Sequence, residues 1–216
     1  MEHHFHTFLH ITLFGVWLGS IVALLVLLLC RYREMLSEPE GQLHLQNLAY
    51  VQRLPKAALI LMLPMGLQLS NNLALITLGD GSMVGIWVFA LLWLVIDWVG
   101  APSGASVASK AMRVVERVLQ AGFVLVLLGA GILSHLSGAP VEAPWLATKL
   151  ILFAVALVIM SGVDALLVPL YQAEESKGGS NGPSRKQSIL MAAGLLALLV
   201  ALLLTAAWTG YTNWRG

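Results

Sequence analysis

The chain has 216 residues, of which 58% are hydrophobic and only 11% are charged, which excludes an ordinary soluble domain. Its formal net charge is +1, which gives no basis for binding nucleic acid. Polar and apolar residues do not alternate over short segments as they do in membrane β-strands, so helices are the predicted spanning structure.

Six apolar runs are long enough to cross a hydrocarbon core of about 30 Å as helices. In chain order they cover residues 6–31, 54–78, 83–99, 114–137, 145–172 and 187–211. The connections between them are short and leave no room for a soluble domain. The predicted fold is therefore an all-α polytopic membrane protein, a six-transmembrane-helix bundle that forms a single integral membrane domain over residues 1–216.

Basic residues are distributed unevenly between the connections. Ten of the twelve lie beside alternate connections, and only Lys149 and Arg215 are left for the other side. By the positive-inside rule, both termini are predicted to lie on the non-cytoplasmic side. A bacterial inner (plasma) membrane is the expected location. The ten residues are Arg31, Arg33, Arg53, Lys56, Lys110, Arg113, Arg117, Lys177, Arg185 and Lys186.

Several polar residues are predicted to share one depth, in the outer third of the bilayer. Polar side chains are costly there, so each indicates a function or a partner. His3, His6 and His10 are spaced three and four residues apart and so share a helix face, which Trp17 continues. The members from the later spans are Gln68, Asn71, Asn72, His135 and Lys149.

These residues also have structural interpretations. His3 and His6 can belong to a solvated terminus, and Lys149 can reach outward to the interface. The side-chain amides of Gln68, Asn71 and Asn72 can join helices by hydrogen bonds.

A second, sparser polar set is predicted in the inner half of the bilayer. Asp97 ends the third span and Asp164 lies within the fifth. They could form a proton relay. We favour structural pairing with the basic residues at the same depth, which are Arg53, Lys56, Arg113 and Arg117.

Two segments resemble a known family. Residues 8–19 (FLHITLFGVWLG) are similar to the first helix of the HemJ-type protoporphyrinogen oxidases and of the CopD-like copper-resistance membrane proteins. Residues 145–150 (WLATKL) resemble the Trp-Leu-His-x-Lys-Leu segment of the HemJ type, preceded by Arg117 and an apolar hairpin. The resemblance covers the first span and the fourth to sixth. It implies a bundle that binds b-type haem on its outer side, with His10 as a ligand and Lys149 in a supporting role.

The chain departs from that family in two ways. Ala147 stands where the family has histidine, and the second and third spans are additional. A copper carrier would be expected to offer methionine or cysteine ligands to Cu(I). Met62 and Met65 are in the second span, but they do not form such a pair facing outward.

The sequence predicts a haem-b-binding membrane redox protein with the haem near its outer, periplasmic face. His10 and His135 are the expected iron ligands, and Lys149 is expected beside a propionate. The other expected pocket residues are Gln68, Asn71, Asn72 and Trp17. Electron transfer or porphyrinogen oxidation would follow, the latter making the protein a membrane oxidoreductase, with a quinone, a porphyrin or a redox protein as partner.

Two alternatives stay open. One is a copper- or metal-handling protein that uses His3, His6 and His10 without porphyrin. The other is a non-catalytic subunit of a larger membrane complex or homo-oligomer, in which the polar residues join helices.

Overall fold

The computed structural model describes residues 2–37, 46–100, 107–175 and 183–213, and its regular elements are all α-helices. The all-α prediction is thus confirmed for the described residues. In chain order the helices are α1 (Glu2–Ser37), α2 (Gln46–Asn72), α3 (Asp80–Val99), α4 (Val107–Ser137), α5 (Pro144–Glu175) and α6 (Pro183–Asn213).

The helices are suited to a bilayer. Five of them, α1 and α3 to α6, are long and apolar enough to cross a membrane. The exception is α2, which carries Gln52, Arg53 and Lys56. Its 27 residues still give a rod of about 40 Å, and Gln52 and Lys56 are buried. The fold is that of a polytopic bundle in which α2 turns polar groups toward its neighbours.

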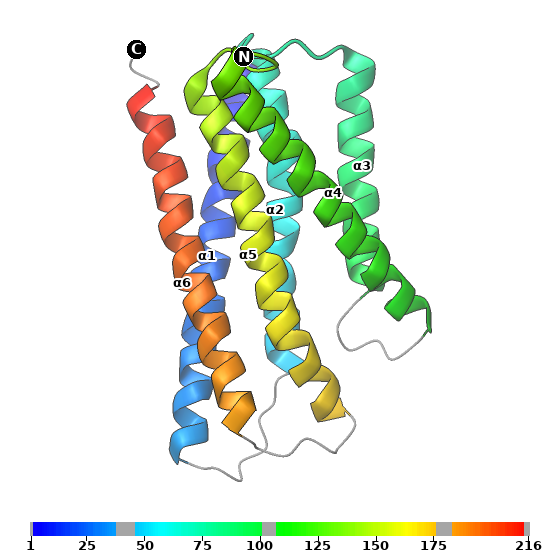
Figure 1. The fold of residues 1–216 in the computed structure, drawn as a ribbon, viewed down its shortest axis with the longest axis vertical. Coiled ribbons are helices and arrows are strands. Elements are labelled where there is room, and N and C mark those ends of the chain that lie inside the picture. Colours follow the sequence, from blue (N-terminus) through cyan, green and yellow to red (C-terminus); the bar gives the residue numbers. More distant parts are fainter. Residues whose placement is uncertain (1, 38–45, 101–106, 176–182, 214–216) are drawn as a thin grey trace.

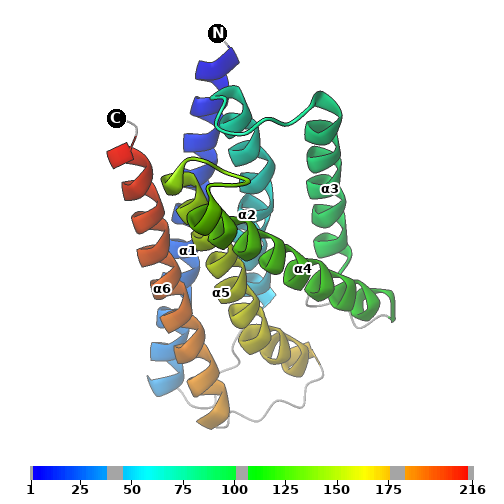
Figure 2. The ribbon, with the colours of Figure 1, turned by 45° about the horizontal axis from the view of Figure 1, so that its top comes forward.

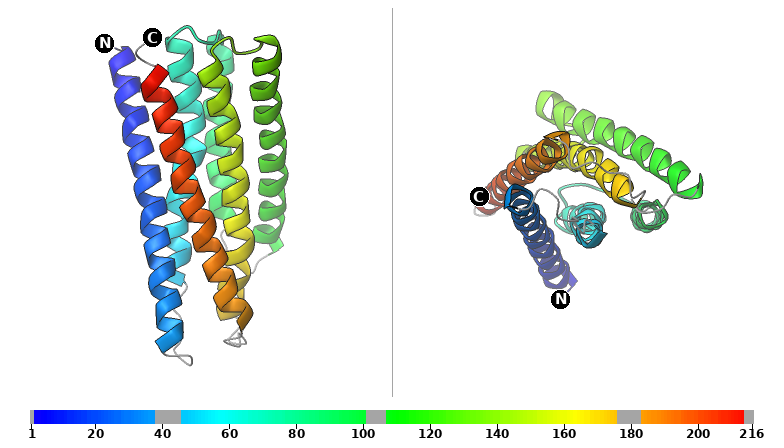
Figure 3. Two further views of the ribbon diagram at one scale, coloured as in Figure 1. Left: turned by 60° about the vertical axis from the view of Figure 1, so that its left-hand side comes forward. Right: turned by 90° about the horizontal axis from the view of Figure 1, so that it is seen from below.

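Successive helices run in alternating directions, so the described chain begins and ends at the same end of the bundle (Figures 1 and 3). We call the end that holds Glu2 and Asn213 the terminal end, and the end that holds Ser37 and Val107 the distal end. α1 packs against α2 and α6, α5 against α4 and α6, and α3 against α2 and α4. Figure 2 shows α4 crossing the bundle obliquely, with its distal part close to α3 and apart from α5.

Apolar packing fixes this arrangement. The core lies between α1, α2, α5 and α6, where the rings of Trp17 and Phe153 pack with centroids 5.9 Å apart. On the other side, Phe89 of α3 stacks on Phe123 of α4 at 5.2 Å. Large apolar side chains such as Leu125 stay exposed on the outer surface, as expected of a surface that faces lipid.

The second helix ends earlier than predicted. α2 stops at Asn72, whereas the apolar run continued to residue 78. Ala74 adopts a positive φ of 55°, which breaks the helical path. The side-chain oxygen of Asn71 accepts the backbone N–H of Leu78 at 2.8 Å and holds the connection in place. Residues 73–78 are therefore an apolar connection, which hydropathy does not distinguish from a span.

Candidate functional site

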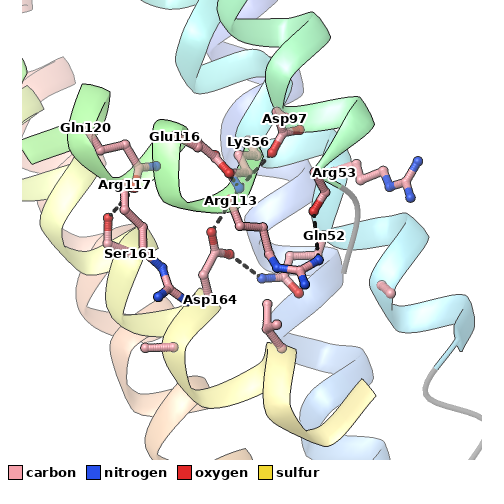
Figure 4. Close-up of a pocket in the computed structure, with 14 residues that line it drawn as sticks. Gln52, Arg53, Lys56, Asp97, Arg113, Glu116, Arg117, Gln120, Ser161 and Asp164 are labelled. Atoms are coloured by element: carbon pink, nitrogen blue, oxygen red, sulfur yellow. Dashed lines mark hydrogen bonds and ion pairs between the residues drawn. The ribbon is translucent and has the colours of Figure 1, made fainter. Parts of the chain in front are cut away.

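One lysine and three carboxylates meet in the distal half of the bundle (Figure 4). Lys56 Nζ on α2 lies 2.7 Å from Asp97 Oδ1 on α3 and 2.6 Å from Glu116 Oε1 on α4. It lies 2.9 Å from Asp164 Oδ2 on α5. We call these four residues the Lys56 cluster. Since each member comes from a different helix, the cluster joins α2, α3, α4 and α5.

The Lys56 cluster is largely removed from solvent and is not electrically balanced. The side chains of Lys56, Asp97 and Glu116 are 11%, 5% and 8% exposed, and that of Asp164 is 22% exposed. One ammonium against three carboxylates leaves a formal charge of −2 when all are ionised. The pairing of Asp97 and Asp164 with a basic residue, which we favoured from the sequence, is confirmed.

The spacing of the carboxylates creates repulsion. Oxygens that contact the same nitrogen lie within about 6 Å of one another, a range in which like charges disfavour ionisation. Asp97 Oδ2 is buried and has no hydrogen-bond partner among the described residues. The cluster can therefore hold a proton on a carboxylate, which would reduce its excess negative charge.

A hydrogen-bond chain extends from the Lys56 cluster toward the distal end of α5. Gln52 Nε2 donates to Asp164 Oδ1 at 2.6 Å, and Gln52 Oε1 accepts from the Tyr171 hydroxyl at 2.6 Å. Nearby, Ser161 Oγ donates to Gln120 Oε1 at 2.8 Å. Polar atoms thus continue from Glu116 through the lysine to a hydroxyl on the last turns of α5.

The Lys56 cluster forms one wall of a cavity of about 330 Å³. Arg53, Arg113 and Arg117 also line this cavity and bring the formal charge of its lining to +1. The Arg53 guanidinium lies over the rings of Tyr50 and Trp98, 5.1 and 5.4 Å from their centroids. The cavity therefore has an acidic part, formed by the three carboxylates around Lys56, and a basic part, formed by the three arginines.

The terminal half contains a different arrangement around His10. The imidazole Nδ1 is buried without a hydrogen-bond partner in the described structure, and a Cβ added at Gly66 would lie 3.8 Å from Cε1. Lys149 of α5 is near enough for its charge to act on this ring. Lys149 Nζ lies 5.1 Å from the Trp145 ring centroid and rests on Gly210 of α6. The structure thus brings His10 and Lys149 to one junction of four helices.

His135, the predicted second iron ligand, lies in the last turn of α4. His135 is exposed near the end of α4, where its Nε2 is 3.2 Å from Thr148 Oγ1. α4 packs against α3 and α5 and not against α1, the helix that carries His10. The two histidines are therefore on helices that do not contact each other directly, and bis-histidine ligation stays a prediction.

The predicted pocket amides have local partners. Gln68 Nε2 donates to Asn72 Oδ1 at 3.2 Å, and Asn71 holds the connection after α2. Their contacts favour the structural interpretation. Trp17, by contrast, is buried against Phe153 and keeps an indole Nε1 without a hydrogen-bond partner among the described residues.

The start of α1 is rich in histidine, and the structure describes its side chains from His4 onward. The side chain of His3 lies outside the described part of the structure, and the ring of His6 contacts Phe5 at a centroid distance of 6.0 Å. Among the described residues, no group of three or more His, Cys, Asp or Glu is arranged to hold a metal ion. The copper alternative through His3, His6 and His10 stays a prediction.

The departure at Ala147 has a steric reason. Ala147 is fully buried, and its carbonyl oxygen would lie 3.0 Å from a Cβ added at Gly131. The same Cβ would lie 2.5 Å from Ile151 Cγ1, so α4 and α5 are in close contact here. An imidazole at position 147 would have no room in this packing.

Glu116 and Gln52 were missed from the sequence. Glu116 lies between Arg113 and Arg117 in a segment that seemed simply basic and cytoplasmic. It is nevertheless nine residues inside α4, at the depth of Asp97 and Asp164. An acidic residue that far inside a spanning helix is a signal that could have found it.

No protein-family model, curated protein or solved structure matches this chain. The resemblance to the HemJ-type and CopD-like proteins accordingly stays a prediction that rests on residues 8–19 and 145–150.

Proposed function

We propose that the Lys56 cluster is a proton-binding site and that the protein is a proton-coupled membrane protein. The observation that carries the proposal is the contact of one buried ammonium with three carboxylates. Structural pairing alone needs one carboxylate for one lysine. Two further carboxylates at the same point add repulsion and desolvation cost, both of which proton uptake reduces.

The surrounding residues suit such a role. Lys56 holds the carboxylates close together, so a proton can be shared among them. Gln52 and Tyr171 connect Asp164 to the distal part of α5 through hydrogen bonds. A proton would enter through the cavity on the side of Arg113 and Arg117.

A hydrophobic carbodiimide tests this proposal, because such reagents modify protonated carboxyl groups within membranes. We expect modification of a carboxylate of the Lys56 cluster in the intact protein, decreasing as the pH is raised. Asp80, which is exposed at the start of α3, is the control and should stay unmodified by the hydrophobic reagent. If Asp97, Glu116 and Asp164 all stay unmodified throughout the pH range, the cluster is structural, as in a non-catalytic subunit.

A second candidate function is haem-b redox chemistry at the terminal end. The specific observation that favours it is His10, whose Nδ1 is buried and without a hydrogen-bond partner among the described residues, beside a glycine and near Lys149. These residues suit a haem group in part: His10 would bind the iron and Lys149 would lie near a propionate. Bound haem would supply one-electron chemistry with a quinone, a porphyrin or a redox protein.

The absorption spectrum tests this second candidate. Purified protein supplied with haem should show a Soret band that His10→Ala abolishes and His6→Ala leaves in place. His6 is the matched control because it lies one turn earlier on the same helix face. A colourless wild-type protein would contradict haem binding and leave the proposal for the Lys56 cluster unaffected.

We also propose that the terminal end faces the periplasm of a bacterial inner membrane. The support is the placement of ten of twelve basic residues at or near the other end of the predicted spans. A reporter fused after residue 216 should behave as periplasmic, and a cytoplasmic result would reverse the orientation.

A further inference from the structure

We infer that α4 and α5 form a pocket at the distal end for the phosphate headgroup of an anionic phospholipid. This pocket of about 390 Å³ adjoins the cavity of the Lys56 cluster, and lipid binding there does not depend on the proposed proton binding. Its polar lining consists of Lys110, Arg113 and Arg117, and none of the acidic residues whose side chains the structure describes lines it. Its remaining lining residues are apolar: Val114, Ala165, Val168 and Pro169.

The three basic residues share one face of α4. Residues 110, 113 and 117 are spaced three and four apart, which places them on adjoining turns. Like charges at this spacing repel one another, and a bound anion relieves the repulsion. Phosphate suits the site because a guanidinium group can donate two parallel hydrogen bonds to its oxygens.

The pocket walls favour a lipid over a soluble anion. Val114 and Val118 are 59% and 67% exposed, and Leu125 continues this apolar surface toward the terminal end. An acyl chain can therefore lie along α4 while its headgroup contacts the basic residues. Basic pockets between spanning helices on the cytoplasmic side are known to suit anionic lipids, and the distal end is the predicted cytoplasmic end.

The pocket adjoins the cavity of the Lys56 cluster. Arg113 and Arg117 line both spaces, whereas Lys110 lines only the basic pocket. Lys110 is exposed and therefore allows a substitution that affects lipid binding without entering the proton site.

Native mass spectrometry of the detergent-solubilised full chain tests the inference. With phosphatidylglycerol and phosphatidylcholine as probes, the wild type should retain phosphatidylglycerol preferentially. Lys110→Gln should weaken its retention by about five-fold, the effect of one basic residue near an anionic surface. The triple variant Lys110→Gln, Arg113→Gln, Arg117→Gln should lose the preference. Lys186→Gln, which removes a basic residue of α6 at the same end, is the control and should keep it.

Two results would overturn the inference. One is equal retention of the two lipids by the wild type, or unchanged preference in Lys110→Gln. The other is displacement of phosphatidylglycerol by millimolar inorganic phosphate, which would identify a soluble anion as the ligand. Neither result bears on carbodiimide modification of the Lys56 cluster, so the two proposals fail separately.

Discussion

The two halves of the bundle differ in how their intramembrane polar side chains are paired. In the distal half, Lys56 finds three carboxylates within the chain. In the terminal half, His10 and Lys149 approach each other, while the acidic residues Asp80 and Glu142 stay exposed. The distal site therefore sets three carboxylates against one ammonium, with Arg53, Arg113 and Arg117 lining the same cavity, and we propose that one of the carboxylates binds a proton. The terminal site has basic groups and no buried acid among the described residues.

The substitution Lys56→Met tests this comparison most strongly, because it should have the largest effect. The substitution leaves the buried Asp97 and Glu116 and the partly exposed Asp164 without their common partner, which should lower the free energy of unfolding by about 3–5 kcal/mol. Thermal unfolding of the purified protein in detergent measures the loss. Lys149→Met is the matched control in the terminal half and should cost far less, because Lys149 rests on Trp145 and Gly210 rather than on a carboxylate. Equal losses in the two variants would contradict the contrast between the halves.

In the terminal half, the largest expected effect is steric. A Cβ at position 131 would meet Ile151 Cγ1 at 2.5 Å and the Ala147 carbonyl at 3.0 Å, so Gly131→Ala must push α4 away from α5. We expect a loss of about 1–3 kcal/mol in unfolding free energy. Gly129→Ala on the same helix has no atom within 4 Å of the new Cβ and should be neutral or slightly stabilising. Equal destabilisation by both variants would argue against this tight contact.

The smallest expected effect comes from removing one of the excess charges. Asp97→Asn keeps the shape of the side chain and removes one of the two unbalanced negative charges, so it should change the unfolding free energy by less than about 1 kcal/mol or increase it. The same substitution should recover part of the stability lost in Lys56→Met, because it removes one stranded carboxylate. An Asp97→Asn variant as unstable as Lys56→Met would show that the cluster needs all three charges.

The fold and the depth of its polar groups could be predicted because both depend on chain order and hydropathy. Successive helices alternate in direction (Figure 3). By their positions within the helices, His10 and Lys149 lie toward the terminal end, and Asp97 and Asp164 lie toward the distal end. Because basic and acidic residues lie at the same depth there, we expected Asp97 and Asp164 to pair with a basic residue, and they pair with Lys56. Neighbour relations between helices do not follow from hydropathy. His135 was accordingly expected as a second iron ligand from its depth alone, and the structure places it on a helix that does not pack directly against α1.

The composition of the distal site was only partly predictable. Glu116 was hidden between two arginines in the sequence, and its inward orientation became evident only from its ion pair with Lys56 of α2. Asn71 was expected in a pocket because it shares the outer third of the bilayer with His10 and Lys149. Its side-chain oxygen accepts the backbone N–H of Leu78 and holds a connection whose apolar residues resemble the end of a span, a contact that hydropathy does not reveal.

Infrared difference spectroscopy of the carboxylic-acid carbonyl stretch tests the central claim most directly, because only a protonated carboxyl group gives this band. The wild-type protein should show the band near neutral pH and lose it as the pH rises. Glu116→Gln and Asp97→Asn should each reduce or shift the band, since both remove a carboxylate from the Lys56 cluster. A wild-type protein without the band near neutral pH, where exposed carboxyl groups are ionised, would mean that all three carboxylates stay ionised around Lys56, and would contradict proton binding at this site.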